Sequence, residues 1–75
     1  MTFPPKRTVG LTDRERQVLG LVADGHTDAE IADMLILSVY TVQNHVKNIL
    51  RKLNARNRTQ ASTIYHQGNM TNSSH

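Results

Sequence analysis

The sequence predicts an all-α fold, a four-helix bundle that contains a helix-turn-helix, and three observations support this prediction. Apolar residues recur at helical spacing along the chain, and no stretch alternates at the two-residue period of a strand for long enough to form one. Ser, Thr or Asn precedes each predicted helix at the position typical of an N-cap. Only about three residues separate the second helix from the third, which forces these helices to cross steeply.

The first predicted helix runs from about Asp13 to Ala23. Thr12 and Glu15 have the spacing of a capping box, in which each side chain accepts a hydrogen bond from the other residue's backbone N–H. Gly25 follows at a position where a helix commonly ends in a left-handed residue. The residues at helical spacing that we expect to face the core are Val18, Leu19, Val22 and Ala23.

The second predicted helix begins with another capping box, formed by Thr27 and Glu30, and ends near Leu35. The link to the third helix is the segment Ile36 to Ser38, which is short enough to indicate helix-turn-helix geometry. The residues available for packing on this helix are Ile31, Ala32, Met34 and Leu35.

The third predicted helix is capped by Ser38 and reaches Leu53, where Asn54 ends it. At about 100° per residue, its apolar residues fall within an arc of about 100° that we expect to be core: Val39, Val42, Val46, Ile49, Leu50 and Leu53. A second arc contains no acidic residue and carries Tyr40, Gln43, Asn44, Lys47 and Arg51, with Asn48 at its margin.

The fourth predicted helix begins at Asn57, with Gln60 at the box position, and extends to about Gln67. Residues 1–10 contain Pro4-Pro5 and predict a flexible leader or the remnant of a linker. Residues 68–75 are almost entirely small and polar and predict a disordered tail. The folded domain is therefore expected to span residues 11–67.

Composition argues against several classes of protein. The 75 residues include no cysteine, so disulfides and thiolate zinc sites are excluded. The longest apolar run, Met34 to Leu37, is far shorter than the roughly 18 residues of a membrane span. We expect a cytoplasmic protein with no membrane partner.

The sequence offers little support for catalysis or metal binding. The histidines His26, His45 and His66 lie on three different elements, and His45 is better explained as a partly buried packing residue. Neither a nucleophile motif nor a glycine-rich phosphate loop is present. We therefore expect no enzyme, no cofactor, no metal and no small molecule bound by this domain.

Charge is distributed unevenly along the chain. All six acidic residues lie within residues 1–33, where four cations leave a net charge of −2, whereas residues 34–75 carry five cations and no acid. A polyanion would bind at this basic end. On charge alone, a solvated helix face explains the five cations equally well.

The polar arc of the third helix has side chains suited to a DNA major groove. Asn and Gln pair with adenine, Lys reaches the O6 and N7 atoms of guanine, and Arg bridges phosphates or contacts guanine. Solvated helix faces usually mix Glu with Lys, which this arc does not. Periodicity and composition thus favour nucleic-acid binding.

Short motifs spread over the predicted domain match a known pattern. They are Leu11-Thr12-Asp13-Arg14-Glu15-Arg16, Val18-Leu19, Glu30-Ile31-Ala32, Leu37-Ser38, Thr41-Val42, Asn44-His45-Val46, Ile49-Leu50, Lys52-Leu53 and Arg58-Thr59-Gln60-Ala61. With these motifs the chain resembles the LuxR-type helix-turn-helix domain of bacterial transcription regulators. The similarity covers about residues 11–65, nearly the whole predicted domain.

The resemblance implies sequence-specific binding of double-stranded DNA by the third helix, with no catalytic role. The residues it places near bases or phosphates are Tyr40, Gln43, Asn44, Lys47 and Asn48, with Thr41 and Arg51 holding the backbone and Thr27 and Lys52 as further phosphate contacts. It also implies a weak homodimer through the last helix, with RNA polymerase as a further candidate partner. The dimer residues would be Ala61, Ile64 and Tyr65.

Two departures from the family pattern affect these expectations. Asp28-Ala29 stands where relatives often have Asn-Lys, which removes one phosphate contact and adds a negative charge. Gln43 stands where many relatives have a cation, so the preferred DNA sequence is expected to differ from theirs.

The main alternative to DNA binding is a protein-interaction module that uses the third or fourth helix. Single-stranded RNA binding would need more exposed aromatic residues than the three present.

Overall fold

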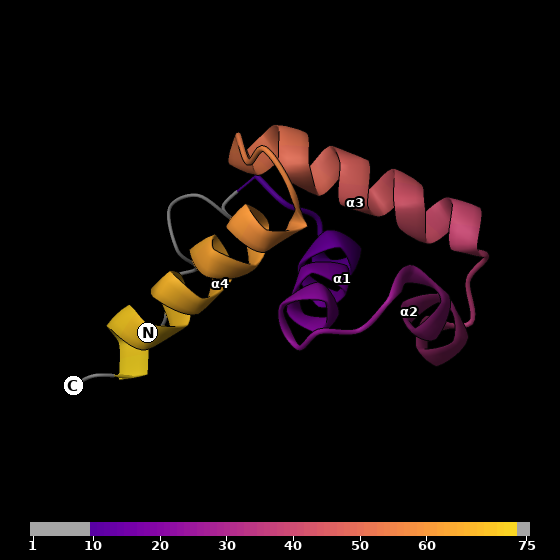
Figure 1. The fold of residues 1–75 in the computed structure, drawn as a ribbon, viewed down its shortest axis with the longest axis horizontal. Helices are drawn as coiled ribbons and strands as arrows, with labels where there is room; N and C mark the ends of the chain where they lie inside the picture. Colours follow the sequence, from indigo (N-terminus) through magenta and orange to yellow (C-terminus); the bar gives the residue numbers. More distant parts are fainter. Residues whose placement is uncertain (1–9, 74–75) are drawn as a thin grey trace.

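The computed structural model describes residues 10–73, and their side chains as far as Gln67. Within this range the chain forms four helices and no strand: α1 (Asp13–Ala23), α2 (Asp28–Leu35), α3 (Val39–Leu53) and α4 (Arg58–Ser73). Helix α1 is central and contacts each of the other three, while α3 lies across one end of the bundle and α2 and α4 flank α1 on opposite sides (Figure 1). The predicted all-α fold with a helix-turn-helix is confirmed.

Both predicted capping boxes are present. The Thr12 hydroxyl oxygen accepts from the backbone N–H of Glu15 at 3.1 Å, and the Glu15 carboxylate accepts from that of Thr12 at 2.9 Å. Thr27 and Glu30 repeat the arrangement at 3.1 and 3.0 Å. These bonds satisfy backbone donors that the first turn of a helix leaves without partners, which fixes where α1 and α2 begin.

Left-handed residues end α1 and α3 as the sequence predicts. Gly25 has φ +94°, and the next backbone N–H, that of His26, donates to the Leu21 carbonyl at 3.1 Å, which completes a Schellman motif. Asn54 ends α3 with φ 56°. Asn tolerates this conformation better than most residues, because its short polar side chain bonds locally.

Helix α2 ends at Leu35, as predicted, but the left-handed turn that ends it was not predicted. Ile36 adopts a left-handed conformation, with φ 57° and ψ 52°, although its side chain branches at Cβ. The following backbone N–H, of Leu37, donates to the Ala32 carbonyl at 2.8 Å. The chain therefore turns from α2 into α3 within three residues, as expected, but through a conformation that is strained for isoleucine.

The core lies between α1 and the other helices. Its buried apolar residues are Leu11, Val18, Leu19, Val22, Ile31, Ala32, Val42, Ile49, Leu53, Ala61 and Ile64, and the predicted core residues Ala23, Leu35, Val46 and Leu50 are half-buried.

The prediction that Met34 and Val39 face the core was wrong. Met34 is 51% exposed and Val39 is 41% exposed. On α2, Met34 lies about 100° away from the middle of the face that packs through Ile31, Ala32 and Leu35. Val39 is the first residue of α3, so no preceding helical turn covers it. Periodicity alone does not distinguish a helix end that projects beyond its neighbours from one that packs.

Helix α4 starts as predicted but ends later. The Asn57 side chain accepts from the backbone N–H of Gln60 at 2.8 Å, whereas the Gln60 side chain accepts from Arg56, one residue before the expected box partner, at 2.6 Å. The predicted end near Gln67 was wrong, because α4 continues to Ser73. Gly68 weakens a helix without stopping it, and no proline follows. The predicted leader (residues 1–10), apart from Gly10, and the last two residues of the predicted tail lie outside the described residues.

Candidate nucleic-acid interface

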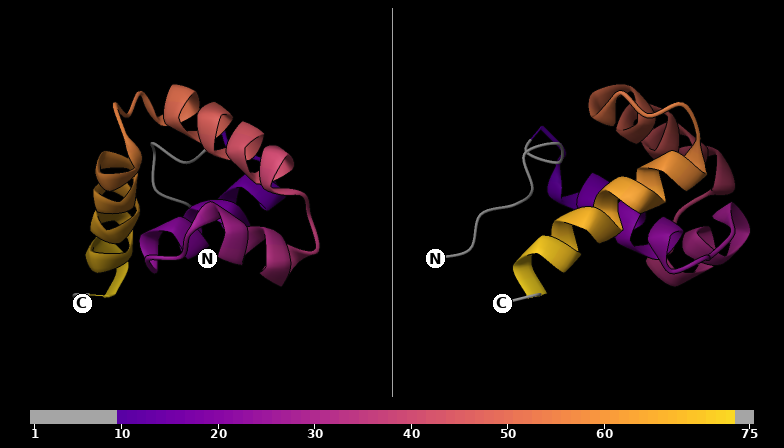
Figure 2. Two further views of the ribbon diagram at one scale, coloured as in Figure 1. Left: turned by 45° about the vertical axis from the view of Figure 1, so that its right-hand side comes forward. Right: turned by 60° about the vertical axis from the view of Figure 1, so that its left-hand side comes forward.

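Helix α3 carries one exposed polar face. Tyr40 is 72% exposed, and Gln43, Asn44, Lys47 and Arg51 are exposed along the same side of the helix, opposite the apolar stripe that packs on the core. Two further views of the ribbon show α3 at the edge of the bundle, with one side free of neighbouring helices (Figure 2). The structure thus places these five residues of the predicted polar arc on one accessible face, whereas Asn48, predicted at its margin, is half-buried.

The N-terminus of α3 differs from those of the two preceding helices. The first turns of α1 and α2 each contain two acidic residues, and the first turn of α3 contains none. The positive end of the α3 dipole is therefore not neutralised by a carboxylate in its own first turn, which favours an anion at this end.

Two hydroxyl groups at this end are oriented by a short network. The Ser38 hydroxyl accepts from the backbone N–H of Thr41 at 3.0 Å and donates to the Thr41 hydroxyl oxygen at 2.9 Å. The Thr41 hydroxyl hydrogen is then available to an acceptor outside the domain. Thr41 itself is half-buried.

The cations of α3 fall into two kinds. Lys47 and Arg51 are exposed and enter none of the ion pairs among the described residues, although an Arg51 Nη donates to Asn48 Oδ1 at 3.4 Å. Lys52, in contrast, places its Nζ 2.8 Å from Glu15 Oε1, and its side chain is only 28% exposed. The charge of Lys52 is compensated inside the domain, which weakens the case for the predicted phosphate contact.

Glu15 is the acidic partner in that pair and is 4% exposed. Burial alone would raise the pKa of Glu15, but hydrogen bonds from Lys52 and Thr12, together with the charge of Lys52, hold it below the ordinary value of 4.5. Sequence reasoning identified Glu15 only as a capping residue. The sequence signal for this ion pair, which was missed, is an acid near the start of α1 together with a cation on the core-facing flank of α3.

Asp28 is also compensated within the chain. It forms an ion pair with Arg58, at the start of α4, and the same guanidinium donates to the backbone carbonyl of His26 at 3.0 Å. The negative charge that distinguishes this chain from the family pattern therefore joins α2 to α4. It is less able to repel DNA than an unpaired aspartate would be.

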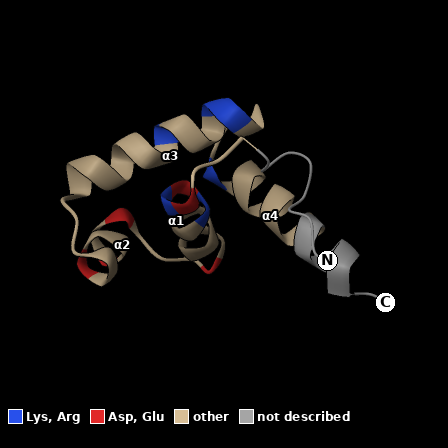
Figure 3. Ribbon diagram, turned by 180° about the vertical axis from the view of Figure 1, so that it is seen from behind, with Lys and Arg blue, Asp and Glu red and all other residues tan. Residues whose placement is uncertain are grey.

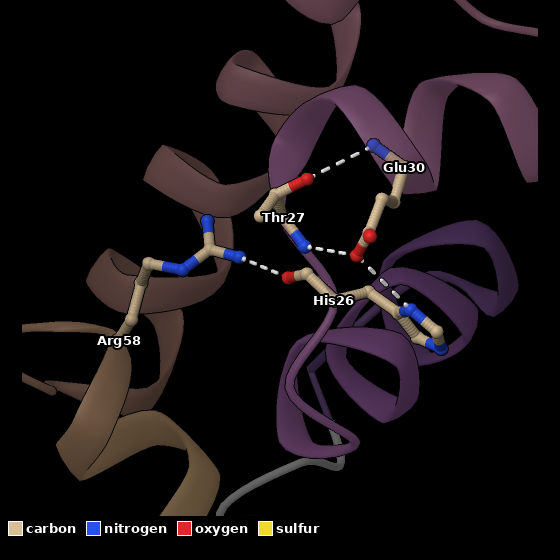
Figure 4. A network of polar contacts seen from close by, with 4 residues as sticks. All are labelled: His26, Thr27, Glu30 and Arg58. Carbon is tan, nitrogen blue, oxygen red and sulfur yellow. Dashed lines mark hydrogen bonds and ion pairs between the residues drawn. The ribbon is translucent and has the colours of Figure 1, made fainter.

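Thr27 and its neighbours form a polar network at the start of α2 (Figure 4). The exposed Thr27 accepts from Glu30, whose carboxylate also lies 3.3 Å from Nδ1 of His26. The backbone hydrogen bond from Thr27, and then the contact with His26, lower the pKa of Glu30. Because this carboxylate already takes the backbone donor of Thr27, only the Thr27 hydroxyl hydrogen is left for a phosphate.

The predicted dimer residues lie mostly inside the domain. Ala61 is 1% exposed and Ile64 is 5% exposed, and both belong to the core. Tyr65 is half-buried, and a Cβ added at Gly20 of α1 would lie 3.3 Å from its hydroxyl oxygen. Ala61 and Ile64 are thus not exposed to a second copy, whereas Tyr65 packs beside Gly20 and stays partly accessible.

The charged residues of α2 and α3 differ in sign, although the pairs of Lys52 with Glu15 and of Arg58 with Asp28 bring opposite charges together. Seen from behind, the cations of α3 lie toward its C-terminal half, whereas the charged residues of α2 are all acidic (Figure 3).

No group of three or more potential metal ligands occurs among the described residues. Nor does any described helix have the length and hydrophobicity needed to cross a bilayer.

Comparison with known proteins identifies relatives of most of the chain. The family model described as bacterial regulatory proteins of the luxR family matches residues 9–71. The transcriptional regulatory protein LiaR of Bacillus subtilis is 42% identical over 62 residues, which are 83% of this chain and 29% of that protein. The DNA-binding transcriptional activator DevR/DosR of Mycobacterium tuberculosis is 49% identical over 55 residues, 73% of this chain and 25% of that protein.

A solved structure supports the same relationship. The crystal structure of SdiA from Escherichia coli superimposes with a TM-score of 0.77 at 37% sequence identity, covering 93% of this chain and 28% of SdiA. The chain thus spans less than a third of the length of each of these relatives.

Proposed function

Since the chain belongs to the luxR family of bacterial regulatory proteins, we propose that it binds double-stranded DNA with sequence preference, as the DNA-binding part of a transcription regulator acting in the cytoplasm. The observation that carries the proposal is the exposed, acid-free face of α3. An α-helix fits the major groove of DNA, where base edges present distinct patterns of hydrogen-bond donors and acceptors.

Individual side chains take separate roles in this proposal. Asn44 and Gln43 hydrogen bond with adenine, and Lys47 donates to the acceptors of guanine. Arg51 and Thr41 bind phosphate oxygens on either side of the groove, and Tyr40 lies where α3 enters it. The arrangement is supported by the exposure of all these residues except the half-buried Thr41, and by the absence of acids in the first turn of α3.

We further propose that two copies bind paired half-sites about one duplex turn apart. The outer side of α4, with the exposed residues Thr59 and Thr63, is the surface left for contact between copies once Ala61 and Ile64 are assigned to the core. Because Thr59 and Thr63 are polar, the contact between copies should be weak without DNA.

The test is a titration of the protein against a pool of random duplexes at two salt concentrations, with sequencing of the bound fraction. We expect enrichment of a paired motif and an affinity that falls steeply with salt, because counterions are released from phosphates. The matched control is Lys47→Ala combined with Arg51→Ala, which should retain the fold and lose the enrichment. No retained duplex at low salt would overturn the proposal and favour a protein partner.

A further inference from the structure

Exposed apolar side chains gather around the N-terminus of α3. Val39, the first residue of the helix, is 41% exposed, the adjacent Tyr40 is 72% exposed, and Ile36 in the preceding turn is 91% exposed. Apolar side chains gain nothing from water, and the two that begin α3 project beyond the core. Their position suggests a role at the surface.

Val39 borders the polar face of α3. Gln43 follows it by one helical turn, and at about 100° per residue the two side chains point only about 40° apart. Val39 therefore lies between the buried stripe and the face assigned to DNA, at the end of the helix that carries no acid. In helix-turn-helix proteins the N-terminal residues of the recognition helix are the ones that contact base edges.

The major groove offers one apolar group to such a side chain, the C5-methyl of thymine. We propose that Val39 contacts a thymine methyl, so that each half-site requires thymine at the position facing the start of α3. This inference rests on the proposed function and adds a determinant of sequence preference that uses no hydrogen bond.

A groove on the α2 side of Val39 marks where the DNA-contacting surface ends. It has a volume of about 530 Å³ and is lined by Ala29, Ala32, Asp33, Ile36, Leu37 and Val39. The exposed carboxylate of Asp33 would repel phosphates there. DNA contact is thus confined to the α3 side of Val39, where Tyr40 and Gln43 continue the surface.

The experiment replaces thymine by deoxyuridine, which removes only the methyl group, at each position of a selected duplex. At one position per half-site, this replacement should weaken binding of the unaltered protein about fourfold, the effect of one buried methyl-sized group. Val39→Ala should lose a similar factor on the thymine duplex and should bind the thymine and deoxyuridine duplexes equally at that position. Val39→Thr, which keeps one methyl group, should retain part of the discrimination.

The matched control is Met34→Ala, which shortens an exposed apolar side chain on α2. It should bind as the unaltered protein does and remain sensitive to the same deoxyuridine. The inference would be overturned if no deoxyuridine replacement weakened sequence-specific binding, or if Val39→Ala still bound the thymine duplex more tightly than the deoxyuridine duplex. Either result would leave the proposed function intact. If the unaltered protein bound no duplex at all, the proposed function itself would be overturned.

Discussion

The Nζ of Lys52 lies 2.8 Å from Oε1 of Glu15, and the same carboxylate oxygen accepts the backbone N–H of Thr12. One buried oxygen therefore both caps α1 and holds the last turn of α3 against it. Ile49 and Leu53, each at most 2% exposed, pack in the same half of α3. The orientation of the DNA-facing helix is thus fixed from its C-terminal half.

Replacing Lys52 by Met should lower the free energy of unfolding by about 1 to 3 kcal/mol, because a buried carboxylate loses a charged donor. Urea denaturation followed by circular dichroism measures the change. Lys47→Met is the matched control, since Lys47 is exposed and enters no ion pair among the described residues. Equal denaturation midpoints for the two variants would contradict a stabilising role for the pair.

Stability should decrease on acidification. The pKa values of Glu15 and Glu30 lie below 4.5 in the folded chain, so the unfolded chain binds protons more readily. The stabilisation is complete above the unfolded pKa and is lost as pH falls through the lower folded values. Denaturation midpoints measured from pH 7 down to pH 3 should show this decline. Glu15→Gln should be less stable at pH 7 and should lose less on acidification; an unchanged pH profile would argue against this assignment.

The pair of Asp28 and Arg58 should couple α2 to α4. In a double-mutant cycle with Asp28→Ala and Arg58→Ala, we expect a coupling energy of about 1 kcal/mol, because the pair is partly shielded from solvent. Arg56→Ala, at an exposed neighbouring cation, supplies the control cycle and should show no coupling with Asp28→Ala. A coupling energy near zero in the first cycle would mean that the contact contributes nothing to stability.

Relief of backbone strain at Ile36 should stabilise the domain. An L-residue in the left-handed region costs about 1 to 2 kcal/mol, and Asn tolerates it better than a residue branched at Cβ. Ile36→Asn should therefore raise the free energy of unfolding by about 1 kcal/mol, since the 91% exposed side chain gives up little burial. The thermal midpoint measures this. Asn54→Ala, at the other non-glycine left-handed residue among those described, should change stability in the opposite direction.

Base and phosphate contacts should respond differently to substitution. Lys47→Ala or Asn44→Ala should cost about 1 to 3 kcal/mol on a preferred site and much less on unrelated duplexes. Arg51→Ala should weaken binding to every sequence alike and reduce the salt slope by about one. Fluorescence anisotropy on preferred and scrambled duplexes separates the two patterns. A loss confined to one base pair for Arg51→Ala would assign it to base contact.

Most of the fold follows from local sequence. Capping residues and apolar periodicity predict the four helices, the start of each and the short turn before α3, because these depend on neighbours within a few residues. The exposure of Val39 was missed because it depends on whether a neighbouring element covers the start of α3, and that of Met34 because the sequence did not show which side of α2 packs. The burial of Ala61 and Ile64 was missed for a related reason: α4 uses its apolar residues to pack on α1.

The candidate site was predicted in part. The exposed face of α3 follows from helical geometry, but the pairings of Lys52 with Glu15 and of Arg58 with Asp28 span 37 and 30 residues of sequence. Periodicity carries no information on such distant partners. Counting charges along the chain therefore overestimated how many cations remain available for a polyanion.

Lys52 and Arg58 are each paired with an acidic residue inside the domain, which limits how strongly the DNA affinity can depend on salt. Of the five cations in residues 34–75, three, namely Lys47, Arg51 and Arg56, are exposed and enter no ion pair among the described residues. Each phosphate neutralised contributes about −0.9 to the slope of log affinity against log salt, so these three supply a slope of about −3 for one bound chain and about −5 for two. The steepness of a salt titration would then count the protein copies on the duplex.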